Sequence, residues 1–131
     1  MASCSPILVV DDDSSLLSTV EAILEDEGYC VKCAANGAEG LEFIEKALPK
    51  LVLLDMRMPH LNGWDFARIL NERNIKLPIV VMTAATDARQ WAQEIDARCY
   101  LAKPFDLSDL LETVDMCMHS TTGAHPPFTF S

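Results

Sequence analysis

Three short motifs that carry carboxylate or amine groups each follow a run of apolar residues. They are Asp11-Asp12-Asp13 after residues 7–10, Asp55 after residues 51–54, and Lys103-Pro104 after residues 100–102. If the apolar runs are parallel strands of one sheet, the motifs meet at its carboxyl edge, where open α/β sheets build their sites. Several carboxylates beside one lysine could bind a divalent cation and a phosphoryl group.

Carboxylates gathered at one edge repel one another unless a cation or a proton balances them. For Asp11, Asp12 and Asp55 at roughly 4–5 Å spacing, each pair costs about 3–4 kcal/mol at an effective dielectric constant of about 20. Hard oxygen ligands around a small opening favour Mg²⁺, with Mn²⁺ as the alternative. A carboxylate that stays partly free beside the cation can attack phosphorus, as in aspartyl-phosphate chemistry.

The same side chains also have ordinary structural explanations. Asp13 is interpreted as the N-cap of the following helix, because a helix start favours an acidic residue. The alternatives are a solvent-facing strand-end acid for Asp55 and a surface lysine whose stem covers apolar residues for Lys103. Thr83, at the end of an apolar run, is either a β-branched strand residue, a helix cap or a hydroxyl donor to a phosphoryl oxygen. One cap does not require three acids, so capping alone does not explain the pair before Asp13.

Apolar runs alternate with segments of helical periodicity along the chain. The runs predict strands over residues 6–10, 29–34, 51–54, 78–83 and 99–102. The periodic segments predict helices over residues 14–27, 37–48, 64–73, 87–97 and 107–118. Such alternation builds βαβ units, and continuously apolar strands suit a parallel sheet covered on both faces. The predicted fold class is therefore α/β, a doubly wound five-stranded parallel sheet with five helices in a three-layer sandwich.

Cap residues give several of the predicted helix boundaries. Asn36 and Glu39 form a plausible capping pair at the start of the second helix. Asp106 is placed to cap the last helix, and Gly28 to end the first one.

The composition limits the partners and the compartment. There are 10 Lys and Arg against 20 Asp and Glu, which gives a net charge of −10. Such an acidic surface argues against direct nucleic-acid binding and against anionic membranes. The chain contains no apolar run of the roughly 18 residues that a transmembrane helix needs, and no signal-peptide pattern. We expect a cytoplasmic protein with one domain over residues 1–119 and a disordered tail over 120–131.

Five cysteines raise the question of redox or metal chemistry. Because the count is odd outside a secreted context, we expect free, mostly buried thiols. Cys30 and Cys33 match the CxxC pattern of redox pairs. Such pairs lie at a helix N-terminus, where the thiol pKa is lowered, whereas these two lie in a strand-like stretch. A redox or metal role for the pair is therefore the weaker interpretation.

The motifs together resemble the receiver domain of response regulators in two-component signalling, the CheY-like family. The resemblance covers about residues 6–118. It rests on Val9-Val10-Asp11-Asp12-Asp13, on Leu54-Asp55-Met56-Arg57-Met58-Pro59 with Asn62-Gly63, on Met82-Thr83-Ala84, and on Tyr100-Leu101-Ala102-Lys103-Pro104-Phe105. Each motif is weakly specific alone, but their order and spacing together are specific.

The resemblance implies a role for each site residue. Asp55 would be the phosphoacceptor, and Thr83 and Lys103 would hold the phosphoryl oxygens. The metal ligands would be Asp12 directly, Asp11 mainly through water, Asp55, and the backbone carbonyl of Arg57.

The resemblance also implies a topology, a switch and partners. The sheet would have the flavodoxin-like order 2-1-3-4-5, and the Lys103–Pro104 bond would be cis. The phosphoryl donor would be a sensor histidine kinase, a phosphotransfer protein or a small donor such as acetyl phosphate. Phosphorylation would draw Thr83 toward the phosphoryl group and turn Tyr100 inward, which changes the face built from the fourth helix, fifth strand and fifth helix. That face would control an unknown downstream protein. The chain would be a monomer or a weak phosphorylation-dependent dimer. It would be a signalling phosphoacceptor and not an enzyme.

Three features depart from the family's pattern. The interval from Thr83 to Lys103 is one or two residues shorter than expected, so the fourth helix should be short or displaced. Ala-Arg at residues 97–98 replaces the usual pair of small residues before the last strand. Arg57 and Ala85 occupy the positions that tune dephosphorylation in the family. Because Ala85 has no group to orient a water molecule, the resemblance implies a phosphoryl state that lasts minutes or more.

Three other functions share part of this pattern. A flavodoxin-like electron carrier would need a Ser/Thr/Gly loop where this chain has three aspartates. A Mg-dependent aspartyl phosphatase of the haloacid-dehalogenase type would need a second aspartate two residues after Asp55, where the chain has Arg57. A degenerate receiver that only docks a partner would lack pocket residues that are present here. The preferred hypothesis is a phosphoacceptor switch in a Mg-dependent phosphorelay.

Overall fold

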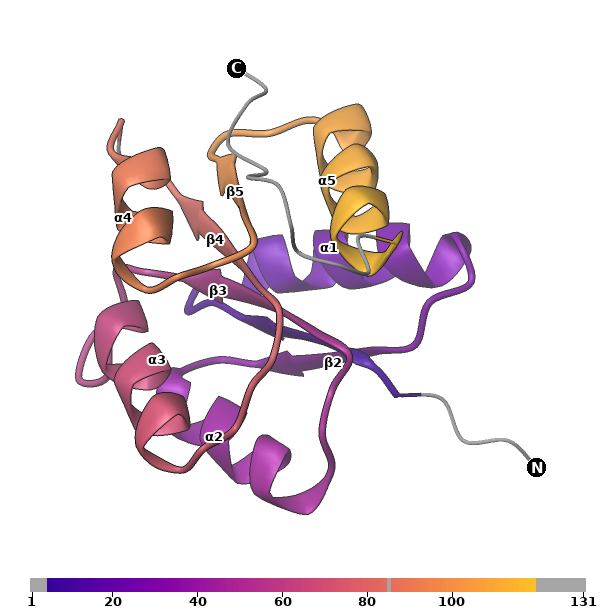
Figure 1. Ribbon diagram of the computed structural model, residues 1–131. Coiled ribbons are helices and arrows are strands. Elements are labelled where there is room, and N and C mark those ends of the chain that lie inside the picture. The colour runs from indigo at the N-terminus through magenta and orange to yellow at the C-terminus, as the bar shows by residue number, and fades with distance from the viewer. Residues whose placement is uncertain (1–4, 85, 120–131) are drawn as a thin grey trace.

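A five-stranded parallel sheet forms the centre of the computed structural model, which describes residues 5–84 and 86–119. The strands are β1 (Ile7–Val10), β2 (Val31–Ala34), β3 (Leu51–Asp55), β4 (Ile79–Thr83) and β5 (Cys99–Ala102). Their spatial order is β2-β1-β3-β4-β5, and every neighbouring pair is parallel (Figure 1). The predicted order 2-1-3-4-5 is confirmed.

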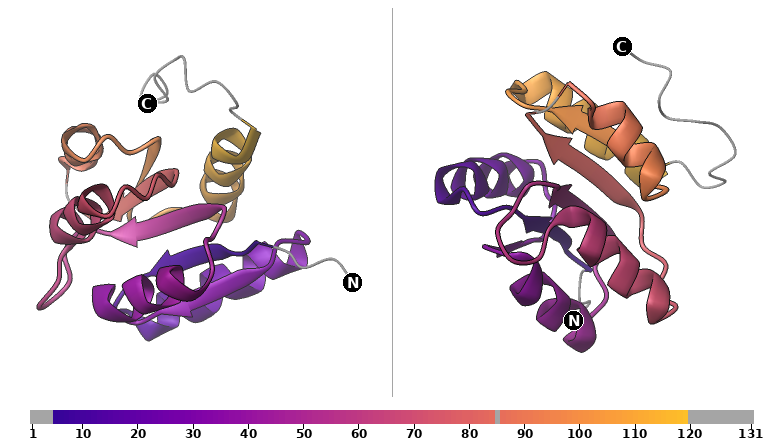
Figure 2. Two further views of the ribbon diagram at one scale, coloured as in Figure 1. Left: turned by 60° about the horizontal axis from the view of Figure 1, so that its bottom comes forward. Right: turned by 90° about the vertical axis from the view of Figure 1, so that its left-hand side faces the viewer.

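Helices cover both faces of this sheet. They are α1 (Ser14–Asp26), α2 (Gly37–Lys46), α3 (Gly63–Glu72), α4 (Ala88–Glu94) and α5 (Leu107–His119). Helices α1 and α5 pack on one face and α2, α3 and α4 on the other, as Figures 1 and 2 show from three directions. The predicted three-layer sandwich is therefore confirmed.

The central strands are apolar at nearly every position because both of their faces are covered. Alternate side chains point to opposite faces of a strand. Ile7 and Val9 therefore pack with α1 and α5, whereas Leu8 and Val10 pack with α2 and α3. Every residue of β1, β3 and β4 is buried. This burial holds the carboxyl ends of the three strands at fixed positions, which is what a site at the sheet edge requires.

The predicted helix caps are confirmed by hydrogen bonds. The Asp13 carboxylate accepts hydrogen bonds from the backbone N–H groups of Ser15 and Leu16 at the start of α1. The Asn36 side chain accepts from the N–H of Glu39, whose carboxylate accepts from the N–H of Ala35. The Asp106 carboxylate accepts from the N–H of Asp109. Gly28 follows the end of α1 with a φ of 96°, a backbone conformation that favours glycine.

Element boundaries differ from the predicted ranges where local hydrogen bonds end an element. The N–H of Tyr29 bonds to the carbonyl of Leu24 at the end of α1, and β2 begins two residues later than predicted. The prediction of a short fourth helix is confirmed, because α4 has seven residues. It ends at Glu94, before the predicted end at residue 97. Asp96 has a φ of 57°, and the N–H of Ala97 donates a hydrogen bond to the carbonyl of Ala92, which closes the helix. The predicted tail, residues 120–131, lies outside the described residues.

The cysteines only partly match the expectation of free thiols. Cys33 is a free, exposed thiol, whereas Cys30 is disulfide-bonded, so the expectation is wrong for Cys30. The two residues of the CxxC pattern are thus not bonded to each other. Cys99 and Cys117 are free and buried. Among the described residues, none of the helices is long and apolar enough to cross a membrane.

Candidate functional site

The parallel register brings the predicted motifs to one edge of the sheet. Val10 of β1 lies opposite Leu54 of β3, so the next residue of each strand, Asp11 and Asp55, continues the same alignment. Thr83 ends β4 opposite Ala102 of β5. Lys103 follows Ala102 directly, so all four polar positions lie at the carboxyl ends of adjacent strands, as the sequence predicts.

Three carboxylates gather at this edge. Carboxylate oxygens of Asp11, Asp12 and Asp55 all lie within 4.8 Å of one another. Asp11 is 0% exposed and Asp55 is 5% exposed, whereas Asp12 is open to solvent. Two buried acids side by side are costly unless positive charge balances them.

Among residues 5–84 and 86–119, Lys103 is the cation that faces both buried acids. Its Nζ donates a hydrogen bond to Asp11 Oδ2 at 2.7 Å and lies 3.6 Å from Asp55 Oδ1. The Lys103 N–H also donates to the carbonyl of Thr83 at 2.8 Å, which extends the β4–β5 pairing. The Lys103–Pro104 peptide bond is cis, as the family resemblance implies. One ammonium group thus serves two carboxylates and favours the nearer one.

The environment of Asp55 makes its ionised form unfavourable. Burial and the neighbouring charge of Asp11 raise the pKa of Asp55 to about 6. Lys103 and the backbone N–H of Arg57, which donates to Asp55 Oδ1 at 3.4 Å, oppose the rise without cancelling it. A carboxylate in this position gains from any additional cation nearby.

The donor set fits Mg²⁺ or Mn²⁺. Asp11 has both oxygens engaged, one by Lys103 and one by the N–H of Asp13 at 2.9 Å, which orients its carboxylate. Three carboxylates against one ammonium leave a surplus of negative charge, and hard oxygen donors favour these cations. The predicted backbone-carbonyl ligand, Arg57, follows Asp55 by two residues in the β3–α3 connection and stays a prediction.

We expect Mg²⁺ to stabilise the folded protein at neutral pH. A ligand at ten times its dissociation constant adds about 1.4 kcal/mol to the free energy of unfolding, or about 4 °C in Tm for a domain of this size. Calorimetry with and without Mg²⁺ should show a smaller shift for Asp12→Asn, which removes one carboxylate of the cluster. Asp26→Asn, at the far end of α1, should keep the full shift. Equal shifts in all three proteins would contradict a metal site at this cluster.

The two predicted switch residues lie on neighbouring strands. Thr83 is 1% exposed at the end of β4. Tyr100 is half-buried in β5 and lies opposite Val81. Their positions are compatible with the predicted movement, and the movement itself stays a prediction.

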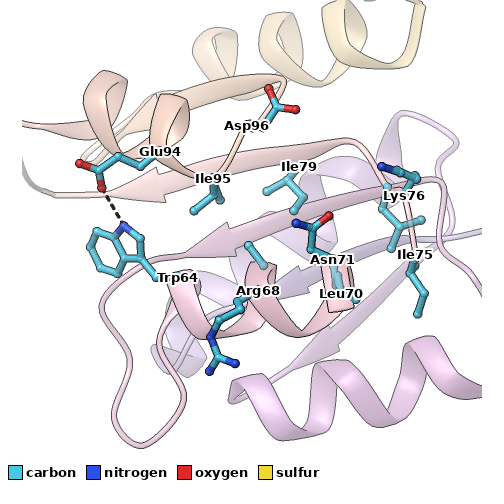
Figure 3. A pocket seen from close by; sticks show the side chains of 12 residues that line it. Trp64, Arg68, Leu70, Asn71, Ile75, Lys76, Ile79, Glu94, Ile95 and Asp96 are labelled. Carbon is cyan, nitrogen blue, oxygen red and sulfur yellow. Dashed lines mark hydrogen bonds between the residues drawn. The ribbon is translucent and has the colours of Figure 1, made fainter. Parts of the chain in front are cut away.

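An aromatic cluster beside the site was not predicted from the sequence. The Arg57 guanidinium lies over the ring of Trp91 of α4, 5.2 Å from its centroid. Trp91 meets Trp64 of α3 edge-on, with ring centroids 4.8 Å apart. Trp64 Nε1 in turn donates a hydrogen bond to Glu94 at 2.8 Å, which Figure 3 shows as a dashed line. Helical spacing placed both tryptophans on the inner faces of predicted helices, but no local signal pairs residues 64 and 91. The cluster connects the loop after Asp55 to the short helix α4.

A groove of about 430 Å³ lies between α3 and α4 next to this cluster, and Trp64 and Glu94 are among its lining residues. Its walls include Arg68 and Asn71 of α3 and Ile95 and Asp96 after α4 (Figure 3). The groove lies on the side of the sheet away from α1 and α5, and it is separate from the carboxylate cluster.

The topology and the acidic edge together define a class of protein. It is a doubly wound α/β domain with a lysine-balanced carboxylate cluster at the carboxyl edge of its sheet. The model of the response regulator receiver domain family matches residues 7–115, and the chain belongs to this family. Members of the family are signalling phosphoacceptors of two-component systems and are not classical enzymes.

Relatives and solved structures agree with this assignment. The chain is 36% identical to the response regulator MprA of Mycolicibacterium vanbaalenii, over 95% of this chain and 57% of the relative. It is 34% identical to the transcriptional regulatory protein DltR of Streptococcus agalactiae, over 82% of this chain and 49% of the relative. The chemotaxis protein CheY4 of Vibrio cholerae has a similar structure, with a TM-score of 0.79, 29% identity, and coverage of 88% and 99%. The chain thus spans about half the length of the curated relatives that it matches.

Proposed function

We propose that Asp55 accepts a phosphoryl group from a histidine kinase or a phosphotransfer protein and that the chain acts as a cytoplasmic switch. One observation carries the proposal: two buried carboxylates, Asp11 and Asp55, share a single ammonium group from Lys103 at the carboxyl edge of the sheet. The negative charge of Asp55 is only partly balanced by Lys103 before the reaction. This side chain is therefore suited to bind a cation and to accept a phosphoryl group.

In the proposed reaction only Asp55, the nucleophile, forms a covalent bond to the phosphoryl group. An oxygen of Asp55 attacks phosphorus, and the bond to the donor's histidine nitrogen or carboxylate oxygen breaks. Lys103 neutralises charge on the phosphoryl oxygens, and the hydroxyl of Thr83 donates a hydrogen bond to one of them. Asp11, Asp12, Asp55 and the Arg57 carbonyl would hold Mg²⁺. When bound, the ion supplies further charge neutralisation at the transferring group.

The output follows from the added charge. A phosphoryl group brings up to about two negative charges into the pocket. Thr83 then moves toward it, Tyr100 turns inward, and the face of α4, β5 and α5 changes its packing against a downstream protein. Moving such an equilibrium from 1:99 to 99:1 takes about 5.5 kcal/mol, which several charge-assisted hydrogen bonds can supply. The protein would act as a monomer or a weak phosphorylation-dependent dimer.

Intact-mass measurement tests the acceptor directly. Wild-type protein incubated with acetyl phosphate and Mg²⁺ should gain the mass of one phosphoryl group, because Asp55 is the nucleophile. Asp55→Asn should gain none, and Asp26→Asn, an exposed aspartate on α1, should behave as wild type. Loss of the added mass in neutral hydroxylamine would identify an acyl phosphate. If wild type gains no mass from acetyl phosphate or from any kinase, the proposal is wrong, and a docking module becomes the better hypothesis.

We expect the phosphoryl group to remain for minutes or more. Ala85 is two residues beyond Thr83 and lies outside the described residues, and its methyl side chain cannot orient an attacking water molecule. The Arg57 side chain lies over Trp91, so it is held by the aromatic cluster. A mass time course after removal of the donor measures the half-life. Ala85→Asn, which adds an amide, should shorten it, and loss within seconds from wild type would contradict the expectation.

A further inference from the structure

Two cysteine sulfurs lie next to each other on the other side of the sheet from the aromatic cluster. Cys99 belongs to β5 and Cys117 to α5, and their Sγ atoms are 2.6 Å apart. Non-bonded heavy atoms in ordinary contact lie about 3.5–4.0 Å apart, and sulfur is larger than carbon. The packing therefore holds the two sulfurs closer than an ordinary contact, within reach of a covalent bond.

The surrounding structure fixes both partners. Cys99 is 1% exposed and Cys117 is 2% exposed, and both belong to the apolar core between the sheet, α1 and α5. The Arg98 guanidinium donates a hydrogen bond to the carbonyl of Cys117 at 3.3 Å, which joins the start of β5 to the end of α5. A single turn of α5 and a single strand position thus determine where the sulfurs lie. Neither cysteine takes part in the carboxylate site.

A groove lies between the two elements that carry the cysteines, although neither cysteine is among its lining residues. The groove has a volume of about 620 Å³ and lies between β5 and α5. Its lining includes Leu101, two residues after Cys99, and Thr113 and Met116, which precede Cys117 on α5 by four residues and by one. Opening of a helix at the edge of a fold costs less than global unfolding, so a small oxidant can reach the sulfurs from this side.

We propose that Cys99 and Cys117 form an oxidisable dithiol site that a hydroperoxide converts into a disulfide between β5 and α5. The thiolate of Cys99 attacks the terminal oxygen of the hydroperoxide, which breaks the O–O bond and leaves a sulfenic acid. The sulfur of Cys117 then displaces that oxygen, and the S–S bond forms. With hydrogen peroxide, the two thiols lose two electrons and two protons, and the peroxide becomes two molecules of water.

The hydrogen bond within the pair sets the order of the two steps. The Cys117 thiol donates to the Cys99 sulfur, which lowers the pKa of Cys99 and, together with burial, raises the pKa of Cys117. Cys99 is therefore the sulfur that attacks first, and Cys117 resolves the intermediate. The disulfide would covalently link α5 to β5, the strand that carries Tyr100. Any effect on output rests on the proposed function, but formation of the bond does not.

Peptide mapping after hydrogen peroxide treatment tests the site. Trypsin leaves Cys99 and Cys117 on one peptide, because cleavage follows Arg98 and Lys103 precedes proline. Peroxide-treated wild type, denatured and alkylated without reduction, should yield this peptide two hydrogens lighter and without alkyl groups. Reduction before alkylation should restore two alkyl groups. The Cys30 disulfide stays on another peptide and does not interfere.

Two controls decide the result. Met116 lies on the same peptide and is 40% exposed, so its oxidation to the sulfoxide reports that peroxide reached this face. If Met116 is oxidised while both cysteines are still alkylated, the proposal is wrong. It is also wrong if the cysteines end as separate sulfinic acids or in disulfides between chains. Cys117→Ala should retain an alkylated or oxygenated Cys99. The assay does not involve Asp55, so a failure here and a failure of phosphoryl acceptance are distinguishable.

Discussion

Asp55→Asn should stabilise the metal-free protein by about 3 kcal/mol at pH 7 and above, and the gain should shrink to less than about 1 kcal/mol near pH 4. The cause is the ionised Asp55 carboxylate, which is buried beside the equally buried Asp11. Burial and Asp11 raise the pKa of Asp55 from 3.8 to about 6. An amide has nearly the same shape but no charge, and Asp11 keeps its hydrogen bond to Lys103.

The sign of the pH dependence follows from proton linkage. Between pH 4 and pH 6 the folded state binds a proton at Asp55 that the unfolded chain has already released. Folding therefore becomes less favourable as pH rises through this window, and the whole penalty is present above the folded pKa. Well below pH 4 both states bind this proton, so Asp55 and its asparagine replacement become equivalent.

Urea denaturation of both proteins from pH 4 to pH 8, in the presence of a chelator, measures the difference. Adding Mg²⁺ at pH 7 should reduce it, because a cation bound at the cluster offsets the charge of Asp55 in wild type only. Asp26→Asn serves as the control for loss of a carboxylate elsewhere and should show no such pH dependence. A stability difference that is constant with pH would exclude repulsion at Asp55 as its cause.

The positions of the site residues could be predicted from sequence because strand ends are simple to locate. The runs before Asp11 and Asp55 are apolar at every position because both faces of their strands are buried. The run before Lys103 is apolar as well, although β5 lies at the edge of the sheet and only Cys99 and Leu101 of this strand are buried. Parallel pairing then aligns the carboxyl ends without any further information. Cap residues such as Asp13 and Asn36 were predictable for a similar reason, since their hydrogen bonds reach only two or three residues along the chain.

Contacts between distant elements could not be predicted in this way. Helical spacing indicates that Trp64 and Trp91 face inward, but the crossing of α3 and α4 decides that their rings meet. Cys99 and Cys117 are 18 residues apart in the sequence, and their proximity likewise depends on how α5 packs on β5. The end of α4 was missed because the turn at Asp96 overrides an apolar pattern that continues to residue 97.

Lys103→Met should lower the rate of phosphoryl acceptance from acetyl phosphate by about 100-fold or more, at saturating Mg²⁺. Within the part of the chain that the structure describes, Lys103 is the cation that faces both acids. Its Nζ lies 2.7 Å from Asp11 Oδ2 and 3.6 Å from Asp55 Oδ1. Methionine fills a similar volume but supplies neither charge nor hydrogen bonds. Charge that develops on the phosphoryl oxygens would then be met by one positive group fewer, which raises the barrier without changing the nucleophile.

The same substitution separates catalysis from folding if two more variants are measured. Removing one partner of a buried ion pair typically costs about 3–5 kcal/mol, so circular dichroism must show that Lys103→Met is folded under the assay conditions. Lys76→Met, an exposed lysine remote from the cluster, should accept phosphate at the wild-type rate. Lys103→Arg keeps the charge, but the planar guanidinium is larger and cannot place one compact donor between two carboxylates, so it should restore only part of the rate. A folded Lys103→Met protein that reacts within about threefold of wild type would show that neutralisation at this edge comes from another group, and the assignment of Lys103 would have to be abandoned.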